Sequence, residues 1–224
     1  MSTRVGVVVF PGTNCELDVV HAVETLGGTA GLVWHGDTTV AGFDALVVPG
    51  GFAHGDYLRT GAIARFSPVM GAVRAFAAAG GAVVGICNGF QVLTEAELLP
   101  GALQKNAGLK FRCETVTCRV ETDRSVLTRG VEVGRELRLP INHFEGNFTC
   151  DDETLARMRD RDQVVLRYVE NPNGSTDDIA GVSNAAGNVV GLMPHPERAA
   201  EVILGSADGA VLLRALLAAA SVLA

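Results

Sequence analysis

The sequence is short of charge and of long apolar runs, and each shortage excludes a class of protein. Only 19% of the 224 residues are charged and 48% are hydrophobic, so the chain can bury a full core and should not be disordered. The net charge of −7 argues against a general nucleic-acid binder. The apolar run at 210–224 is short for a membrane span and is interrupted by Arg214, so we expect no membrane association and a packed terminal helix.

The sequence also lacks any cysteine framework. Its cysteines are odd in number, and their spacings match no disulfide or zinc pattern: Cys15, Cys87, Cys113, Cys118 and Cys150. Cys113 and Cys118 are five apart in a strand-like stretch, so they should face opposite sides of a sheet, which weakens a metal site. No signal-peptide pattern is visible either. We therefore predict reduced thiols, no bound metal and a cytoplasmic location.

No internal repeat, low-complexity tract or linker divides the chain, which favours a single domain over residues 1–224. In the first half, strands alternate with helices. The expected strands are 4–10, 29–34, 44–48 and 82–86, and the expected helices are 13–27, 67–79 and one opening at 90–96. Thr13 with Glu16 has the pattern of a capping box, and Ser67 is expected to cap the next helix.

The second half is richer in strands. Expected here are strands at 109–121, 136–141 and 164–169, a turn at 184–188 between two more strands, a polar helix at 153–161 and a terminal helix. The early strands are nearly continuous apolar runs, which is typical of a parallel sheet covered on both faces. The prediction is an α/β fold: a mostly parallel central sheet, helices on both faces and a strand-rich second half.

Gly85-Ile86-Cys87-Asn88-Gly89 follows a buried strand and precedes a helix. This is the cysteine form of the G-x-S-x-G nucleophile turn, in which glycines remove the Cβ atoms that a sharp strand-to-helix turn would crowd. The sulfur would stand at a helix N-terminus, which favours a thiolate, and the N–H of Asn88 could face an oxyanion. A buried, inert cysteine is the alternative, but the flanking strand and helix favour a nucleophile.

A thiolate nucleophile needs a proton carrier. Of five histidines, His195 stands out because it lies in Met193-Pro194-His195-Pro196-Glu197 after an apolar strand. In an extended backbone, His195 and Glu197 would project to the same side, so the carboxylate could orient the imidazole. Taken alone, this short motif would be better read as a surface turn.

G-I-C-N-G-F-Q at 85–91 and M-P-H-P-E-R at 193–198 together resemble the class I glutamine amidotransferases. The chain is more closely similar to the stand-alone glutaminase subunits of phosphoribosylformylglycinamidine synthase, an enzyme of purine biosynthesis. Further matches are F-P-G-T-N-C at 10–15, P-G-G-F-A-H-G-D-Y-L-R at 49–59 and Q-V-L-T-E-A at 91–96. The resemblance covers nearly the whole chain in order.

The resemblance implies the roles of individual residues. It places the catalytic triad on Cys87, His195 and Glu197, the main-chain oxyanion hole on Gly51 and Asn88, and substrate contacts at Gln91 and the main chain around His143. The chain departs from the usual family residues at His54, Asn142 and Phe144, where tyrosine, alanine and glycine are usual. Cys15 also lies at a predicted helix N-terminus, but no histidine partner is evident, so a buried structural role is expected.

The implied reaction is hydrolysis of glutamine through a Cys87 glutamyl thioester. The chain has no G-x-x-x-x-G-K-[ST] phosphate loop, so we expect no cofactor here. ATP and magnesium would lie on a large synthase subunit that also binds formylglycinamide ribonucleotide, with a small bridging subunit completing the complex. Two alternatives stay open: a glutaminase serving another ammonia acceptor, and a catalytically dead interaction module of the same fold.

Overall fold

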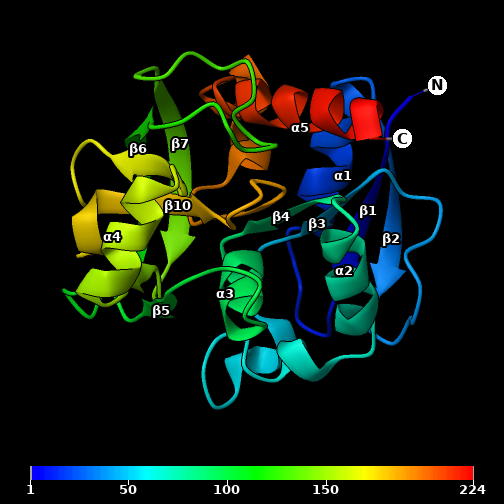
Figure 1. The fold of residues 1–224 in the computed structure, drawn as a ribbon, viewed down its shortest axis with the longest axis horizontal. Coiled ribbons are helices and arrows are strands. Elements are labelled where there is room, and N and C mark those ends of the chain that lie inside the picture. Colours follow the sequence, from blue (N-terminus) through cyan, green and yellow to red (C-terminus); the bar gives the residue numbers. More distant parts are fainter. Residues whose placement is uncertain (1, 224) are drawn as a thin grey trace.

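In the computed structural model, which describes residues 2–223, one nine-stranded sheet runs through both halves of the chain (Figure 1). Its strands in chain order are β1 (Arg4–Val9), β2 (Thr29–Trp34), β3 (Ala45–Val48), β4 (Ala82–Ile86), β6 (Arg112–Val120), β7 (Glu136–His143), β9 (Val164–Tyr168), β10 (Ile179–Ser183) and β11 (Val189–Leu192). Across the sheet their order is β2-β1-β3-β4-β11-β10-β9-β6-β7. Two short strands, β5 (Ala102–Gln104) and β8 (Asn147–Thr149), form a separate antiparallel pair.

Strand direction confirms the mostly parallel sheet. Strands β2, β1, β3, β4 and β11 are neighbours and all run parallel. The pairs beyond β11 are antiparallel, so β10 and β6 run one way while β9 and β7 keep the direction of the first five. The strand-rich second half is therefore an extension of the first sheet.

Helices cover both faces of the parallel part, as predicted. The helices are α1 (Glu16–Thr25), α2 (Val69–Ala78), α3 (Asn88–Glu95), α4 (Asp152–Asp160) and α5 (Gly209–Leu223), with short 3₁₀ turns at η1 (Ala53–Asp56), η2 (Ala64–Phe66), η3 (Thr176–Asp178), η4 (Pro196–Ala199) and η5 (Val202–Leu204). In Figure 1, α1 and α5 lie together on one side of β1, β3 and β4, and α2 and α3 lie on the other. Every residue of β3 and β4 is buried, because side chains cover both faces there.

Several local predictions are confirmed. The strands at Thr29–Trp34 and Ala82–Ile86 have the predicted bounds, and residues 184–188 do join β10 to β11. Cys113 is exposed and Cys118 is buried on opposite faces of β6. Within residues 2–223, no helix combines the length and the apolar composition that crossing a membrane would require.

The two predicted helix caps are wrong. The Thr13 hydroxyl accepts the N–H of Phe10 (3.0 Å) and so serves the preceding turn, and Cys15 is the residue that precedes α1. The Ser67 hydroxyl pairs with Nε2 of His54 (3.3 Å), and Pro68 stands at the start of α2. In both cases a contact outside the helix takes the hydroxyl that the local pattern had assigned to the cap.

Candidate active site

Cys87 occupies a sharp turn between β4 and α3, with no spacer on either side. Its backbone has φ = 50° and ψ = −106°, a combination that L-residues rarely adopt and that costs about 1–3 kcal/mol. The surrounding structure holds it there: the N–H of Cys87 donates to the carbonyl of Leu192 on the neighbouring β11 (2.8 Å). The predicted nucleophile turn is thus confirmed in its geometry.

The glycines of the turn are needed for close backbone approach. A Cβ on Gly85 would lie 2.6 Å from the carbonyl oxygen of Gly89, and a Cβ on Gly89 would overlap the carbonyl of Val48 on β3. Contacts below 3.0 Å are not tolerated by real side chains, so larger residues would push α3 away from the sheet. The spacing seen in the sequence follows from this packing.

His195 and Glu197 form a buried pair. Nδ1 of His195 lies 2.6 Å from Oε1 of Glu197, and each residue is about 1% exposed. The predicted pairing is confirmed, but the predicted extended backbone is wrong, because Pro196 begins the 3₁₀ turn η4. The turn brings the two side chains together over a shorter distance than a strand would.

Electrostatics favour the imidazolium form of His195. Burial alone would lower its pKa, but the Glu197 carboxylate, together with the thiols of Cys87 and Cys15, holds the pKa well above its usual value. Nε2 of His195 has no hydrogen-bond partner within residues 2–223. The pair therefore offers a proton on an otherwise unoccupied nitrogen.

Cys87 and His195 open into one cavity of about 320 Å³, which is large enough for a small molecule. Other residues singled out from the sequence also line it: Cys15, Gly51, Gln91, Asn142, His143 and Phe144. Glu197 lies behind His195, and the side chain of Asn88 lies behind the cavity wall. The structure thus brings the predicted nucleophile and base to one cavity.

The two proposed oxyanion donors have free main-chain N–H groups. Neither the N–H of Gly51 nor that of Asn88 donates to a protein acceptor in the described part of the chain. Gly51 has φ = 144°, and a Cβ there would lie 2.7 Å from the N of Asn14, so the position requires glycine. Both N–H groups remain available for an anionic oxygen.

Gln91 and His143 line the cavity but are held by protein contacts. The Gln91 amide accepts from Nδ2 of Asn88 (2.9 Å) and donates to the carbonyl of Glu145. Nδ1 of His143 pairs with Asn106 (3.1 Å). Burial, followed by the charge of His195, lowers the pKa of His143 to about 4, so this ring is neutral at pH 7. Both residues therefore shape the wall that substrate would meet.

Of the three departures from the family pattern, one lies outside the cavity and two line it. His54 faces away from the cavity: its ring packs edge-on against His35 (5.2 Å between centroids), and burial and His35 lower its pKa. Asn142 and Phe144 line the cavity. The carbonyl of Asn142 accepts the Cys87 thiol (3.8 Å), and the Phe144 ring lies under Nζ of Lys105 (6.0 Å).

Sequence reasoning missed several residues of the cavity. Asp56 and Glu145 bring two carboxylates to its wall, and Arg198 brings a guanidinium. Arg198 donates to Oδ2 of Asp18 (3.1 Å) and to the sulfur of Cys15 (3.1 Å). Asp56 lies in the glycine-rich loop 49–59, which the family resemblance includes, but no local pattern in that loop assigns Asp56 to the cavity.

Cys15 is buried as predicted, but the reason given for its role is wrong. It does have a histidine neighbour: its sulfur, a ring nitrogen of His195 and a carboxylate oxygen of Glu197 all lie within 4.8 Å of one another. The histidine comes from a segment 180 residues later, which is why sequence adjacency could not reveal it.

Comparisons with known proteins agree with this geometry. A model of the CobB/CobQ-like glutamine amidotransferase domain matches residues 2–208. The chain belongs to the glutamine amidotransferases. It is 57% identical over 219 residues to the "Phosphoribosylformylglycinamidine synthase subunit PurQ" of Rubrobacter xylanophilus (98% of this chain, 100% of the relative). It is 56% identical to the Synechococcus elongatus protein of that name (96% and 97%).

Solved structures lead to the same family. A chain in the structure of PurLQS from Thermotoga maritima superposes with a TM-score of 0.90 at 42% identity, covering 97% of this amidotransferase and 99% of that chain. A Thermoplasma acidophilum protein that is 15% identical superposes with a TM-score of 0.69 over 99% of this chain and 96% of that one, and this likeness concerns the fold alone.

In this amidotransferase, one buried asparagine holds the wall segment 143–146. Asn106 donates through Nδ2 to the carbonyl of His143 (3.0 Å) and accepts through Oδ1 from the N–H of Gly146 (3.1 Å). From the other side, Asn173 donates to the carbonyl of Gly146 (2.8 Å). Since Glu145 lies within this segment, its position depends on both asparagines.

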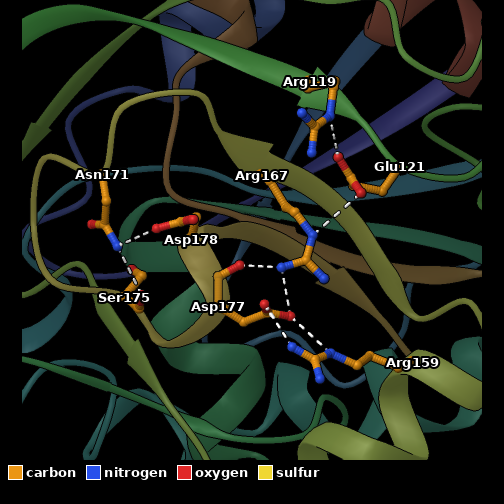
Figure 2. A network of polar contacts seen from close by, with 8 residues as sticks. All are labelled: Arg119, Glu121, Arg159, Arg167, Asn171, Ser175, Asp177 and Asp178. Carbon is orange, nitrogen blue, oxygen red and sulfur yellow. Dashed lines mark hydrogen bonds and ion pairs between the residues drawn. The ribbon is translucent and has the colours of Figure 1, made fainter.

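The loop that carries Asn173 is itself anchored by charges (Figure 2). Asp177 accepts from Arg159 of α4 (2.7 Å) and from Arg167 of β9 (2.5 Å). Arg167 also pairs with Glu121 (3.2 Å), which follows β6. The network ties α4, β9 and β6 to the loop, and so it supports the wall of the active site from behind.

Proposed function

We propose that this chain is the glutaminase subunit of a phosphoribosylformylglycinamidine synthase. The observation that carries the proposal is the strained Cys87 turn, which opens into a cavity shared with the His195–Glu197 pair. Relatives that are 54–57% identical over nearly their whole length carry the synthase subunit's name, which favours this acceptor over the other ammonia acceptors.

The chemistry begins with the Cys87 thiolate. It attacks the side-chain carbonyl carbon of glutamine, and a carbon–sulfur bond forms while the carbonyl oxygen becomes an oxyanion. The free N–H groups of Gly51 and Asn88 stabilise that charge. The carbon–nitrogen bond then breaks, and Nε2 of the His195 imidazolium gives its proton to the leaving nitrogen, which departs as ammonia.

Hydrolysis of the thioester completes the cycle. Neutral His195 takes a proton from water as the water oxygen bonds to the acyl carbon. The carbon–sulfur bond breaks, the thiolate and the imidazolium are restored, and glutamate leaves. Glu197 keeps Nδ1 of His195 occupied throughout, so that Nε2 faces the reaction. The main chain around His143 helps to hold the amino-acid end of glutamine.

Ammonia passes from this active site to a partner. A large synthase subunit would bind ATP, magnesium and formylglycinamide ribonucleotide, and a small bridging subunit would complete the complex. The PurLQS structure, which contains a chain 42% identical to this one, supports that assembly. We place the protein in the cytoplasm as one glutaminase domain spanning residues 1–224, with no cofactor or metal of its own.

The test is Cys87→Ala in the reconstituted complex. Glutamine-dependent synthesis should be lost, whereas synthesis from an ammonium salt should continue at the wild-type rate, because only the release of ammonia needs the thiol. Cys15→Ala is the matched thiol control and should retain glutamine-dependent synthesis. A Cys87→Ala complex that still used glutamine would show that the assignment is wrong. A wild-type complex that made no product from either nitrogen source would point to another acceptor.

A further inference from the structure

The active-site cavity contains two carboxylates for which the described part of the chain provides no cation. Asp56 follows β3 in the glycine-rich loop, and Glu145 follows β7; both line the cavity. Among the residues that the structure describes, Asp56 accepts one amide N–H, from Asn88 (3.2 Å), and Glu145 accepts one hydroxyl, from Thr60 (3.0 Å). Within residues 2–223 neither forms an ion pair.

Arg198 cannot supply the missing charge. It is the one cationic side chain among the described residues that line the cavity, apart from the paired His195, and it already contacts Asp18 and Cys15. Burial raises the pKa of Asp56 to about 6, and the charge of Glu145 adds to this effect. The two carboxylates are therefore close enough to repel each other, a situation that a bound cation would relieve.

The surrounding hydrogen bonds fix both carboxylates in place. Asn88 uses Nδ2 to hold Asp56 and Gln91 together, and its Oδ1 accepts the N–H of Ala53 (2.9 Å). Gln91 in turn holds the carbonyl of Glu145. Each end of the Gln91 amide is held by one protein contact, so Gln91 is a positioning residue, and the carboxylate oxygens are the anionic groups of this wall that can contact a ligand.

We propose that Asp56 and Glu145 bind the α-ammonium group of glutamine. The proposal rests on the proposed function, which places the side-chain amide at Cys87 in the same cavity. Glutamine carries one cationic group, and the unpaired carboxylates are the one anionic pair without a partner among the described residues of the cavity wall. This contact would orient the substrate and would reject amides that lack the ammonium group.

The experiment compares two substrates in the assembled complex. One is glutamine; the other is 4-carbamoylbutanoate, which keeps the amide and the carboxylate but has hydrogen in place of the α-ammonium group. Glutaminase kcat and KM are measured for the wild type, Asp56→Asn and Glu145→Gln. Glu97→Gln is the control, because that carboxylate is 80% exposed and lies outside the cavity. Thermal unfolding establishes that each variant is folded.

We expect kcat/KM for glutamine to fall on the order of 10- to 100-fold in each cavity variant, mainly through KM, since an ionic hydrogen-bond acceptor becomes a neutral one. For 4-carbamoylbutanoate the wild type and both variants should agree within about twofold, and Glu97→Gln should match the wild type on both substrates.

Three results separate the alternatives. Equal losses on both substrates would mean that the carboxylates merely maintain structure, and the inference would be overturned. An unchanged KM for glutamine with more glutamate released per product would assign the pair to the released ammonia instead, and would overturn it as well. A wild-type complex with no glutaminase activity would refute the proposed function itself.

Discussion

Asp56→Asn should make the free protein more stable, even though it weakens glutamine binding. A group whose folded pKa is raised binds its proton more tightly in the folded state, so its ionised form destabilises that state. For Asp56 the pKa rises from 3.8 to about 6, first because of burial and then because of Glu145. The stability of the wild type should therefore increase as the pH falls from about 6 toward 4. Asparagine carries no charge at any pH, so Asp56→Asn should gain most over the wild type above pH 6 and progressively less below it.

The magnitude follows from the same values. A pKa raised from 3.8 to about 6 would correspond to about 3 kcal/mol if it were fully transmitted to folding. Asp56 is only about half buried, and solvent screening reduces the effect to about 1 kcal/mol. For a chain of this length, that raises Tm by about 2–4 °C. At pH 5 Asp56 is mostly protonated in the folded wild type, so the stability that Asp56→Asn gains over the wild type should be about half of its value at pH 8.

The assay is urea unfolding of the wild type and Asp56→Asn at pH 8 and pH 5. Glu97→Gln is again the control, and it should leave stability unchanged at both values because its side chain is 80% exposed. An Asp56→Asn protein that is no more stable than the wild type at pH 8 would refute the reasoning. So would a gain of equal size at pH 5, since the effect must follow titration of the carboxyl group.

Three further outcomes are expected from the geometry of the site. His195→Ala should lower glutaminase kcat about 10²–10⁴-fold and Glu197→Gln less, as measured by glutamate release; the reverse order in folded proteins would contradict their roles. Gly89→Ala should lower the unfolding free energy by about 1–3 kcal/mol and abolish activity, because the new methyl overlaps the carbonyl of Val48. A Gly89→Ala protein as stable as the wild type in denaturant would contradict this. Asn106→Ala should lower the free energy of unfolding by about 2–4 kcal/mol, because it leaves buried backbone groups unpaired. It should also raise KM for glutamine. If neither the unfolding free energy nor KM changed, the segment 143–146 would be held by other contacts.

The sequence predicts most of the sheet because its strands are coded locally. Ala82–Ile86 has the predicted bounds, since an apolar run is broken sharply by a glycine pair before it and by the Cys87 turn after it. The turn itself was predictable for the same reason: the need for glycines on both sides is a constraint within five residues. The helix caps at Thr13 and Ser67 were not, because a contact outside the helix takes each hydroxyl, with Phe10 in the preceding turn for Thr13 and with His54 for Ser67.

The acidic part of the cavity could not have been found in this way. Asp56 and Glu145 lie 89 positions apart in loops that follow different strands, and they meet only because β3 and β7 end at the same edge of the sheet as Cys87. Neither loop has a pattern that pairs it with the other. What the sequence does predict is the location, since in parallel sheets ligands bind at the carboxyl ends of the strands.

The same geometry decides which of two thiols is the nucleophile. Cys15 and Cys87 both precede helices and both lie beside His195, so neither position nor burial separates them. The sulfur of Cys15 is engaged on two sides, because it donates to Oδ1 of Asn14 (3.2 Å) and accepts from Arg198. Its own N–H is taken by the carbonyl of Gly50 (3.2 Å).

The sulfur of Cys87 is far less engaged, although its own N–H is likewise taken, by the carbonyl of Leu192 (2.8 Å). Over residues 2–223, that sulfur forms one weak hydrogen bond, at 3.8 Å to the carbonyl of Asn142, and the N–H of Asn88 beside it donates to no acceptor. A nucleophile must give up its contacts to attack, and an oxyanion needs donors that no protein group has taken. Backbone strain also falls on Cys87, whereas Cys15 has an ordinary φ of −107°. The unsatisfied groups and the strain therefore converge on Cys87, which leaves Cys15 to shape the surroundings of the shared histidine.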